Sequence, residues 1–475
     1  METNIIFGAP GCGKTTYLME ILEKELMKIS VDKIAYVSFT KKGAYEGRDR
    51  ALLKFPSFNK SDFNYFRTLH SIAFKECGLT MNDVINKKDY KHFSEAMDMH
   101  FTGYYTEEFY NNDDIYLFLS LLKKNNFIAY QNYLTNNPDF NLYKLKNVYE
   151  NYQRYKQEYN LIDFTDMLEM FCNKNNPLPV DIAIIDEAQD LTTLQWKMCS
   201  IAFRNCKRIY IAGDDDQAIY EWSGADVKQF LRLNGKKFIL DQSYRLKKNI
   251  LNFSKNITKM LQDKVEKDFN PIDSGGEIIY LNNIEEMNEL NIDEDYYFLS
   301  RNNCFLNIYE KYLMERGYIF YKKDKLSIDY NIIDAIKIFE KARKFKNLGD
   351  NETKIKPYIS ENYNLSKPWY LNFKLDIDQL NYYRKIIQYK RSLNKVKIHI
   401  NTIHGVKGGE ADNVILLFNM TRACYLNLEN NTDSELRCLY VAFTRAKNKL
   451  YIIKSDNNYS YDSYLQFNFN EGLIV

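Results

Sequence analysis

The sequence predicts an α/β protein with two doubly wound domains, each built on a parallel sheet and each carrying a mainly helical insertion. Three observations support this fold class. Strand-length apolar runs alternate with stretches of helical spacing, a glycine-rich segment joins the first run to the first helix, and a second series of runs begins after Tyr244. Such alternation is typical of parallel sheets that are covered by helices on both faces.

The composition describes a folded protein with more than one core. A chain of 475 residues is too long for a single core, so roughly two to four domains are expected. Hydrophobic residues make up 45% and charged residues 27%, which excludes a disordered chain. The net charge is only +2, so any grip on nucleic acid must come from local patches. The eight cysteines form no C-x-x-C pair, which favours reduced thiols and argues against zinc.

The apolar runs also bear on location. Runs such as Val414–Phe418 have the length of strands and are too short to span a membrane. The first predicted strand begins almost at the N-terminus, which leaves no room for a signal peptide. We therefore expect a cytoplasmic protein with no membrane partner. The bias towards Asn, Lys, Ile and Tyr indicates an AT-rich genome, so the expected compartment is the cytosol of a bacterium or of a virus-infected host cell.

The first series of elements begins with a strand and a helix. The helix is expected at Thr15–Ile29, where Leu18 and Leu22 share an apolar face at helical spacing. The predicted strands of this series are Asn4–Gly8, Lys33–Phe39, Phe63–Phe66, Ile182–Ile185, Arg208–Ala212 and Lys237–Leu240. We expect a first domain over residues 1–80 and 160–240. Residues 81–159 are rich in Tyr, Asn and Lys at helical spacing, which predicts a helical insertion between its two halves.

The second series predicts another α/β domain of similar design. Its strands are expected at Glu277–Leu281, Tyr296–Ser300, Ile398–Thr402, Val414–Phe418 and Leu450–Ile453. We place this domain at residues 241–340 and 396–475. The polar segment 341–395 is expected to form a smaller insertion.

The glycine-rich segment predicts a nucleotide-binding loop. The pattern G-x-x-x-x-G-K-[ST] lies between a predicted strand and a predicted helix, which is the context that a P-loop requires. Backbone N–H groups and the start of the helix attract phosphate, Lys14 would reach the β- and γ-phosphates, and Thr15 would bind Mg²⁺. The expected nucleotide-binding residues here are Gly8, Ala9, Pro10, Gly11, Cys12, Gly13, Lys14, Thr15 and Thr16.

Two later strands end in acidic and amide residues that complete this chemistry. Asp186 and Glu187 follow the strand at Ile182–Ile185. Asp186 is expected to share the Mg²⁺ with Thr15, and Glu187 to act as general base for the attacking water. Gln217 follows the next strand in a Gly-Asp-Asp-Asp-Gln segment, a few residues before Tyr220 and Trp222. This arrangement suits a protein that couples nucleotide hydrolysis to a grip on stacked bases.

The ordered motifs resemble those of superfamily 1 DNA helicases of the UvrD/Rep/PcrA group. Residues 8–15, 186–190 and 213–225 are similar to the first, second and third motifs of that family. The segments that resemble its remaining motifs are residues 39–44, 68–71, 163–168, 242–245, 402–410 and 440–446. The resemblance touches both predicted domains and implies that each is a RecA-like P-loop domain.

The resemblance also implies roles for individual residues. Gln217 would sense the γ-phosphate, Tyr244 would stack on the adenine and Glu410 would contact the ribose. Arg245 and Arg445 would be arginine fingers supplied by the second domain. An arginine finger accelerates nucleotide hydrolysis by about 10³–10⁵-fold.

A DNA track is implied by the same motifs. Phe39, Tyr220 and Trp222 are candidate stacking residues, and stacking contributes about 1–3 kcal/mol per base without reading sequence. The additional candidates for DNA contact are Thr40, Thr68, His70, Thr402 and His404. A basic cluster that includes Lys41 and Lys42 lies next to Phe39.

Three departures from the family pattern are visible. Only a few residues precede the first predicted strand, so we expect no upstream adenine-reading glutamine segment, and use of NTPs other than ATP stays open. Gly409 stands where the family usually carries an apolar residue. The second insertion is also much shorter than the corresponding domain of the family.

The sequence therefore predicts an ATP-dependent DNA helicase or translocase that moves 3′ to 5′ on single-stranded DNA and unwinds duplex. ATP would be hydrolysed at the cleft between two RecA-like domains. The expected cofactors are ATP and Mg²⁺, and the expected partners are single-stranded and duplex DNA and replication or repair proteins, with the chain acting as a monomer. Three alternatives stay open: a translocase that displaces proteins without unwinding, an RNA-directed motor, and a nucleotide-gated binding switch.

Overall fold

The chain forms two compact units in the computed structural model, which describes residues 1–39, 41–105, 113–389 and 395–465, without the side chains of residues 41 and 42. The first unit comprises Met1–Ser274 and Leu426–Val441, and the second comprises Gly275–Tyr425 and Ala442–Val475. Each unit contains its own sheet, so the predicted class, two α/β domains with parallel sheets, is confirmed.

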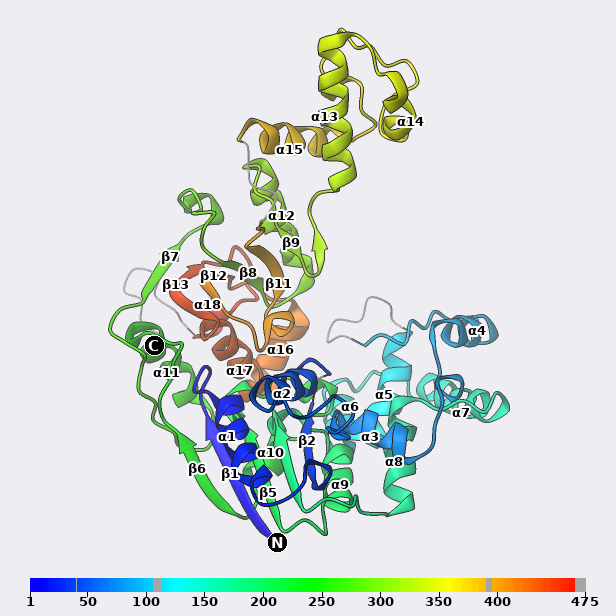
Figure 1. Ribbon diagram of the computed structural model, residues 1–475, viewed down its shortest axis with the longest axis vertical. Helices are drawn as coiled ribbons and strands as arrows, with labels where there is room; N and C mark the ends of the chain where they lie inside the picture. Colours follow the sequence, from blue (N-terminus) through cyan, green and yellow to red (C-terminus); the bar gives the residue numbers. More distant parts are fainter. Residues whose placement is uncertain (40, 106–112, 390–394, 466–475) are drawn as a thin grey trace. The chain divides into compact units, whose positions relative to one another are not determined.

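The sheet of the first unit is parallel throughout, in the order β3-β2-β4-β5-β1-β6, and Figure 1 labels its strands β1, β2, β5 and β6. Its strands are β1 (Glu2–Gly8), β2 (Ile34–Ser38), β3 (Tyr65–Arg67), β4 (Ile182–Asp186), β5 (Arg208–Gly213) and β6 (Lys236–Leu240). The register pairs Phe7 with Gly213 and Ser38 with Asp186. The carboxyl ends of these strands therefore share one edge, where ligands bind in sheets of this kind.

Both faces of this sheet are buried, which explains the continuous apolar runs. Successive residues of a strand point to opposite faces, so Ile5 and Ile6 enter different core layers. Helix α1 (Lys14–Leu26) contributes Leu18 and Leu22 to the layer that contains Ile6. The other main helices of the unit are α2 (Lys41–Lys54), α3 (Leu69–Glu76), α8 (Phe164–Lys174), α9 (Thr193–Ala202), α10 (Val227–Leu231), α11 (Lys248–Met260) and α17 (Thr432–Phe443).

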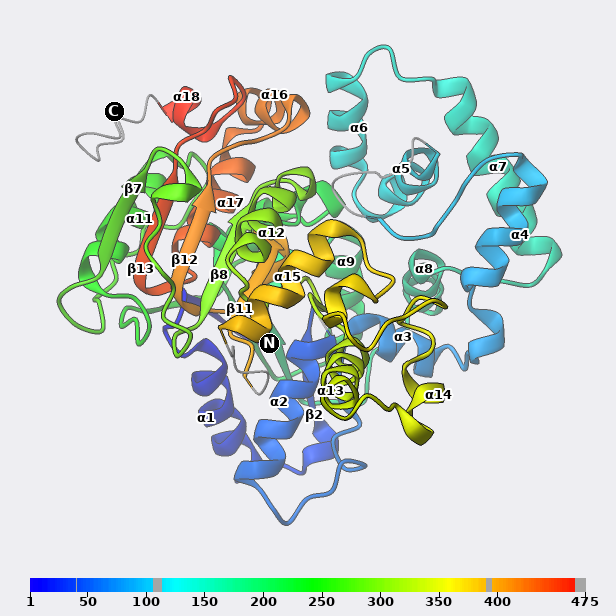
Figure 2. The same ribbon diagram turned by 90° about the horizontal axis from the view of Figure 1, so that it is seen from above.

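The named elements that the structure describes between α3 and α8 are all helices, and Figure 2 shows the four longest grouped together. They are α4 (Lys87–Met97), α5 (Asp114–Asn125), α6 (Phe127–Asn136) and α7 (Leu142–Glu158). The group has its own small core, in which Phe93, Leu117 and Val148 are buried. Its apolar side chains therefore pack on one another, as helical spacing in this segment predicted.

The second unit has a seven-stranded sheet in the order β10-β9-β11-β8-β12-β13-β7. All its pairs are parallel except the short β9–β10 pair, which is antiparallel. The strands are β7 (Glu277–Leu281), β8 (Tyr296–Ser300), β9 (Tyr321–Lys322), β10 (Lys325–Leu326), β11 (Ile398–Thr402), β12 (Ala411–Leu417) and β13 (Ala446–Ile453). The sequence did not predict β9 and β10, because two-residue strands leave no alternating pattern. Helices α12 (Leu306–Glu315) and α18 (Tyr461–Leu465) belong to this unit, and α16 (Arg422–Asn430) includes the point where the second unit's segment ends at Tyr425.

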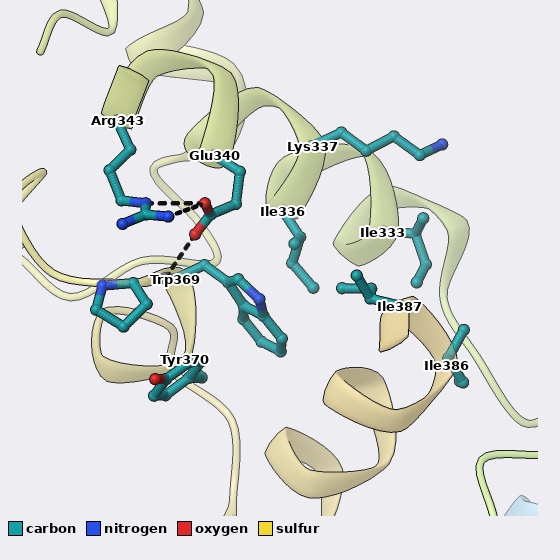
Figure 3. Close-up of a pocket in the computed structure, with 10 residues that line it drawn as sticks. Ile333, Ile336, Lys337, Glu340, Arg343, Trp369, Tyr370, Ile386 and Ile387 are labelled. Atoms are coloured by element: carbon teal, nitrogen blue, oxygen red, sulfur yellow. Dashed lines mark hydrogen bonds and ion pairs between the residues drawn. The ribbon is translucent and has the colours of Figure 1, made fainter. Parts of the chain in front are cut away.

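A small helical insertion interrupts the second unit. It contains α13 (Tyr330–Phe345), α14 (Glu352–Ile355) and α15 (Ile377–Gln388). A cavity of about 520 Å³ lies between α13, the Trp369 turn and α15, and Figure 3 shows its apolar lining by Ile336, Trp369 and Ile387. Glu340 at its rim accepts from the Trp369 backbone N–H and pairs with Arg343. None of the predicted site residues lines this cavity.

The compact units differ from the predicted domain boundaries at two places. Residues 241–274 and 426–441 were expected in the second domain, yet they belong to the first unit. Backbone hydrogen bonds explain the first case, because the N–H of Tyr244 donates to the carbonyl of Gly11 at 2.8 Å. In the second case, Arg437 of α17 pairs with Glu221 at 2.7 Å. Neither contact leaves a local sequence pattern.

Candidate functional site

The P-loop lies at the carboxyl end of β1, directly before α1. Gly11 and Gly13 adopt the left-handed backbone region, with φ of 71° and 77°. Glycine is favoured there because other L-residues enter this region at a steric cost. A Cβ atom on Gly8 would clash with the Cys12 sulfur, so the loop closes tightly on itself. The sequence pattern thus corresponds to a backbone cradle followed by a helix N-terminus, and Thr15 and Thr16 lie in the first turn of that helix.

Lys14 folds back over this cradle. Its Nζ donates to the carbonyl of Gly8 at 2.8 Å and to that of Ala9 at 3.3 Å. Burial lowers the pKa of Lys14, but negative neighbours outweigh burial and the net shift is upward. The groups that raise its pKa are Cys12, Asp214, Glu187 and Asp186. Lys14 therefore stays charged among acidic groups from β4 and β5.

Asp186 ends β4 and is buried. One carboxylate oxygen accepts from the Tyr36 hydroxyl at 2.7 Å, and the other accepts from the Glu187 backbone N–H at 2.9 Å. Burial and the neighbouring Glu187 raise the pKa of Asp186 to about 6. Burial and Asp186 likewise raise the pKa of Tyr36, so this hydroxyl keeps its proton and donates a hydrogen bond to Asp186. Burial disfavours the ionised form of this carboxylate, and a bound cation would stabilise that form and lower its pKa.

Glu187 has a left-handed backbone, with φ of 53°. A non-glycine residue in this region stores conformational energy of about 1–3 kcal/mol, and such residues cluster at functional sites. The turn directs the Glu187 side chain towards Gln189, whose Nε2 donates to Glu187 Oε2 at 2.5 Å. The candidate general base is therefore held by a side chain two residues further along.

A hydrogen-bond chain continues from Gln189 to Gln217. Gln189 Oε1 accepts from the Asp214 backbone N–H at 3.1 Å, and Asp214 Oδ2 accepts from Gln217 Nε2 at 2.6 Å. The structure thus joins two predicted site residues, Glu187 and Gln217, through Gln189 and Asp214. Local sequence patterns indicate no role for either linking residue. Their contact depends on β4 and β5 being neighbours in the sheet.

A buried lysine lies under the same segment. Lys267 is only 1% exposed in its side chain, and its Nζ lies 3.1 Å from Asp214 Oδ1 and 3.0 Å from Asp216 Oδ2. It also pairs with Asp215. Burial raises the pKa of Asp216 to about 7, with Lys267 opposing the shift. Sequence reasoning missed Lys267, because no motif surrounds it.

Residues 243–245 pack directly on the P-loop. Ser243 Oγ donates to the Pro10 carbonyl at 3.1 Å. The Tyr244 side chain is 67% exposed, and its ring lies 3.9 Å from the position that a Cβ on Gly13 would take. A ring exposed beside a P-loop is a suitable platform for a base. Arg245 was expected from the second domain, but it belongs to the first unit and lies against Gly11.

Two of the three candidate stacking residues lie together. The rings of Phe39 and Tyr220 are stacked, with centroids 5.5 Å apart and an interplanar angle of 28°. Trp222 instead packs on the helical insertion, with its ring 6.0 Å from that of Phe118. Asn126 donates to the Gly224 carbonyl at 3.1 Å and holds this segment on α5 and α6. Part of the Trp222 surface is thus used in packing.

The polar candidates of the DNA track differ in their environments. Thr68 caps α3 by accepting from the Ser71 N–H at 3.2 Å, which is a structural role. The His70 ring meets the Phe164 ring edge-on at 5.6 Å. Thr40 and the side chains of residues 41 and 42 lie outside the described part of the chain.

The remaining candidates belong to the second unit. Thr402 Oγ1 accepts from the Gly405 N–H at 3.3 Å, and His404 begins the 3₁₀ turn that follows β11. Glu410 is exposed and directly precedes β12, and Arg445 directly precedes β13.

Arg445 is buried within the second unit. Its guanidinium donates to the Gly409 carbonyl at 3.0 Å and to Thr444 Oγ1 at 3.2 Å. A Cβ on Gly409 would lie 2.6 Å from the Tyr297 hydroxyl. This close approach explains why Gly409 stands where the family usually has an apolar side chain. Tyr297 fills the space that such a side chain would take.

The donor set fits a nucleotide-bound magnesium ion. Within the described residues, no group of three or more His, Cys, Asp and Glu side chains has the arrangement of a self-contained metal site. Magnesium is usually held by one or two carboxylates together with substrate phosphates, and Asp186 beside the P-loop offers such a carboxylate. Across the ranges described, no helix is both long enough and apolar enough to traverse a bilayer.

Comparisons with known proteins agree with this geometry. Residues 1–238 match the UvrD/REP helicase N-terminal domain, and residues 373–457 match the UvrD-like helicase C-terminal domain. The ATP-dependent DNA helicase PcrA of Staphylococcus epidermidis is 29% identical over 155 residues, which are 30% of this chain and 21% of that protein. The ATP-dependent DNA helicase Rep of Buchnera aphidicola is 24% identical over 374 residues, covering 71% of this chain and 54% of that protein.

This chain therefore spans about half or less of the length of these relatives. The helicase nonstructural protein 10 of an arterivirus matches 95% of this chain and 59% of its own, at 11% identity and a TM-score of 0.35. That score is too low to indicate the same overall structure.

Proposed function

The chain belongs to the UvrD/REP helicase family, and on this basis we propose that it is an ATP-dependent DNA motor. In this proposal it moves 3′ to 5′ along single-stranded DNA and unwinds duplex ahead of it. The observation that carries the proposal is the chain of hydrogen bonds from Glu187 through Gln189 and Asp214 to Gln217. It links the group that would activate water to the segment that continues into Tyr220.

The acidic and basic groups at the edge of the first sheet suit phosphoryl transfer. The Lys14 ammonium would neutralise phosphate oxygens, and Thr15 and Asp186 would hold Mg²⁺. When bound, Mg²⁺ would neutralise charge on the leaving phosphate oxygens. Glu187 would accept a proton from water, and Gln217 would respond to the presence of the terminal phosphate. Arg445 of the second unit would complete the cation set, so hydrolysis would require the two RecA-like domains to close.

The free energies of base stacking and of strand separation are similar in size. The Phe39–Tyr220 pair offers an aromatic surface, and one stacked base contributes about 1–3 kcal/mol. Separating one DNA base-pair step costs on average about 1.4 kcal/mol. One stacking exchange per hydrolytic cycle is therefore sufficient to hold a melted base.

The test measures ATP hydrolysis and strand separation together. ATPase rates are compared with no nucleic acid, with single-stranded DNA and with RNA, and unwinding is assayed on duplexes with a 3′ or a 5′ tail. We expect stimulation by DNA and unwinding of the 3′-tailed duplex. Lys14→Ala should abolish both activities, whereas Lys24→Ala on the exposed face of α1 should change neither. Unwinding of only the 5′-tailed duplex would refute the direction, and stronger stimulation by RNA would refute the choice of substrate.

A second candidate function is a translocase that displaces proteins without separating strands. The small insertion of the second unit, from α13 to α15, favours it, because little structure is available there to engage duplex. ATP-driven release of a protein block from single-stranded DNA, with no unwinding of either tailed duplex, would support this candidate over the first.

A further inference from the structure

Strand β2 places a tyrosine beneath the end of β4. Tyr36 and Ser38 alternate with Ala35 and Val37, so the two pairs point to opposite faces of the sheet. The register sets Ser38 opposite Asp186 and Tyr36 opposite Ile184. Asp186 therefore shares the face of Tyr36 and lies two residues further towards the carboxyl edge. The tyrosine ring is long enough to bring its hydroxyl to that carboxylate.

Two hydrogen bonds hold the Asp186 carboxylate from both sides. The Tyr36 hydroxyl donates to Oδ2 at 2.7 Å, and the Glu187 backbone N–H donates to Oδ1 at 2.9 Å. One partner belongs to the buried strand β2 and the other to the turn that follows β4. Hydrogen bonds to charged groups are roughly twice as strong as neutral ones. The two hydrogen bonds therefore favour one orientation of the Asp186 carboxylate, since each of its oxygens has its own donor.

The tyrosine ring itself is confined by its neighbours. It is fully buried and stacks on Phe66 of β3, with ring centroids 5.5 Å apart and an interplanar angle of 16°. On α2, a Cβ at Gly47 would lie 2.5 Å from the ring, so the ring occupies the space that a side chain would need. A glycine at position 47 of α2 therefore leaves the space that the Tyr36 ring occupies.

We propose that Tyr36 is a positioning residue that fixes the Asp186 carboxylate in the orientation that holds the catalytic divalent cation. This inference rests on the proposed function, since it assumes that Asp186 binds the cation together with nucleotide. Partners that hydrogen-bond a metal ligand typically change metal affinity or activity by about 10–100-fold when they are removed. Tyr36→Phe removes only the hydroxyl and keeps the ring, so the same range applies here.

The test measures cation binding apart from catalysis. Mn²⁺ affinity is followed by electron paramagnetic resonance in the presence of ADP, and ADP affinity is measured separately in EDTA. We expect Tyr36→Phe to weaken Mn²⁺ binding by about 10-fold or more, to leave ADP affinity in EDTA unchanged, and to raise the Mg²⁺ concentration needed for half-maximal ATPase activity. Wild-type Mn²⁺ affinity in this variant would overturn the proposal.

A matched control separates positioning from general packing. The Tyr210 hydroxyl donates to Glu25 at 2.8 Å, so Tyr210→Phe removes the same kind of hydrogen bond at a distant carboxylate. It should lower thermal stability to a similar extent without changing Mn²⁺ affinity. If both variants weaken Mn²⁺ binding equally, Tyr36 has only a structural role and the proposal fails.

A second variant reaches the same carboxylate by another route. Gly47→Ala keeps the Tyr36 hydroxyl but crowds its ring, so it should also weaken Mn²⁺ binding. Unchanged binding in Gly47→Ala would count against the proposal even if Tyr36→Phe folds poorly. Failure of the proposed function has a different signature: a wild-type protein that binds Mn²⁺ and ADP tightly but whose ATPase ignores DNA leaves the role of Tyr36 intact.

Discussion

Replacement of Lys267 by methionine should destabilise the first unit more than any exposed lysine replacement. The lysine is buried among Asp214, Asp215 and Asp216 and forms an ion pair with each of them. Methionine keeps most of the side-chain volume and removes the charge. The substitution therefore isolates the electrostatic contribution of Lys267 from its packing.

The expected magnitude follows from burial. Removing one partner of a buried ion pair leaves an uncompensated charge and costs about 3–5 kcal/mol. Domains of this size unfold with free energies of about 5–15 kcal/mol, so the loss is a large fraction of the total. Lys228 provides a matched control, because it pairs with Asp263 at 2.9 Å where both side chains are exposed. Lys228→Met should cost no more than about 1 kcal/mol.

The effect should depend on pH in a defined direction. Burial raises the pKa of Asp216 to about 7 in the folded state, well above its ordinary value of 3.8. A group with a raised folded pKa contributes stability that is complete below its unfolded pKa and is lost as the pH rises through the folded value. Without Lys267 the pKa of Asp216 should rise further. The difference between variant and wild type should therefore be larger at pH 8 than at pH 5.5.

The assay is urea unfolding followed by tryptophan fluorescence. Trp196 and Trp222 lie in the first unit and Trp369 in the second, so a Trp369→Phe background reports the first unit alone. A loss of less than about 1 kcal/mol for Lys267→Met at pH 8, the size of an exposed pair, would show that this buried cation contributes no more than a surface lysine. A loss that is greater at pH 5.5 than at pH 8 would contradict the expected dependence on Asp216.

Two further predictions concern close contacts. Gly409→Val should destabilise the second unit by about 1–3 kcal/mol, because the Cβ of the new valine would meet the Tyr297 hydroxyl. Adding Tyr297→Phe should restore part of this stability, measured by urea unfolding followed at Trp369. Equal stability of Gly409→Val and wild type would contradict this. Trp222→Ala should lower the unfolding free energy of the first unit by about 1–3 kcal/mol, and its effect should be non-additive with Phe118→Ala because the two rings are in contact. Strict additivity of the two losses would show that the contact contributes nothing.

The residues of the nucleotide pocket were accessible to sequence reasoning because each belongs to a local pattern. The P-loop is a contiguous strand, turn and helix, and its glycines are required by backbone geometry that the pattern records. Asp186 and Glu187 follow an apolar run whose length identifies a buried strand. The parallel α/β class was predictable for the same reason, since alternating strands and helices leave a period that is readable along the chain.

Other contacts were not accessible, because they join residues far apart in sequence. Tyr36 and Asp186 are brought together by the pairing of β2 with β4, and Lys267 contacts Asp214 although no motif surrounds the lysine. The placement of Arg245 beside Gly11 likewise reversed the expectation that it comes from the other domain. In each case a motif included at least one residue of the contact, but the local pattern did not indicate its partner.

By itself, the sequence determined the fold class, the family and the chemical types gathered for phosphate, because these depend on backbone patterns that repeat locally. Only the tertiary structure decided which side chain holds which carboxylate. Hydrogen bonds and ion pairs act over a few ångströms, and strand order alone sets which distant residues come within that range.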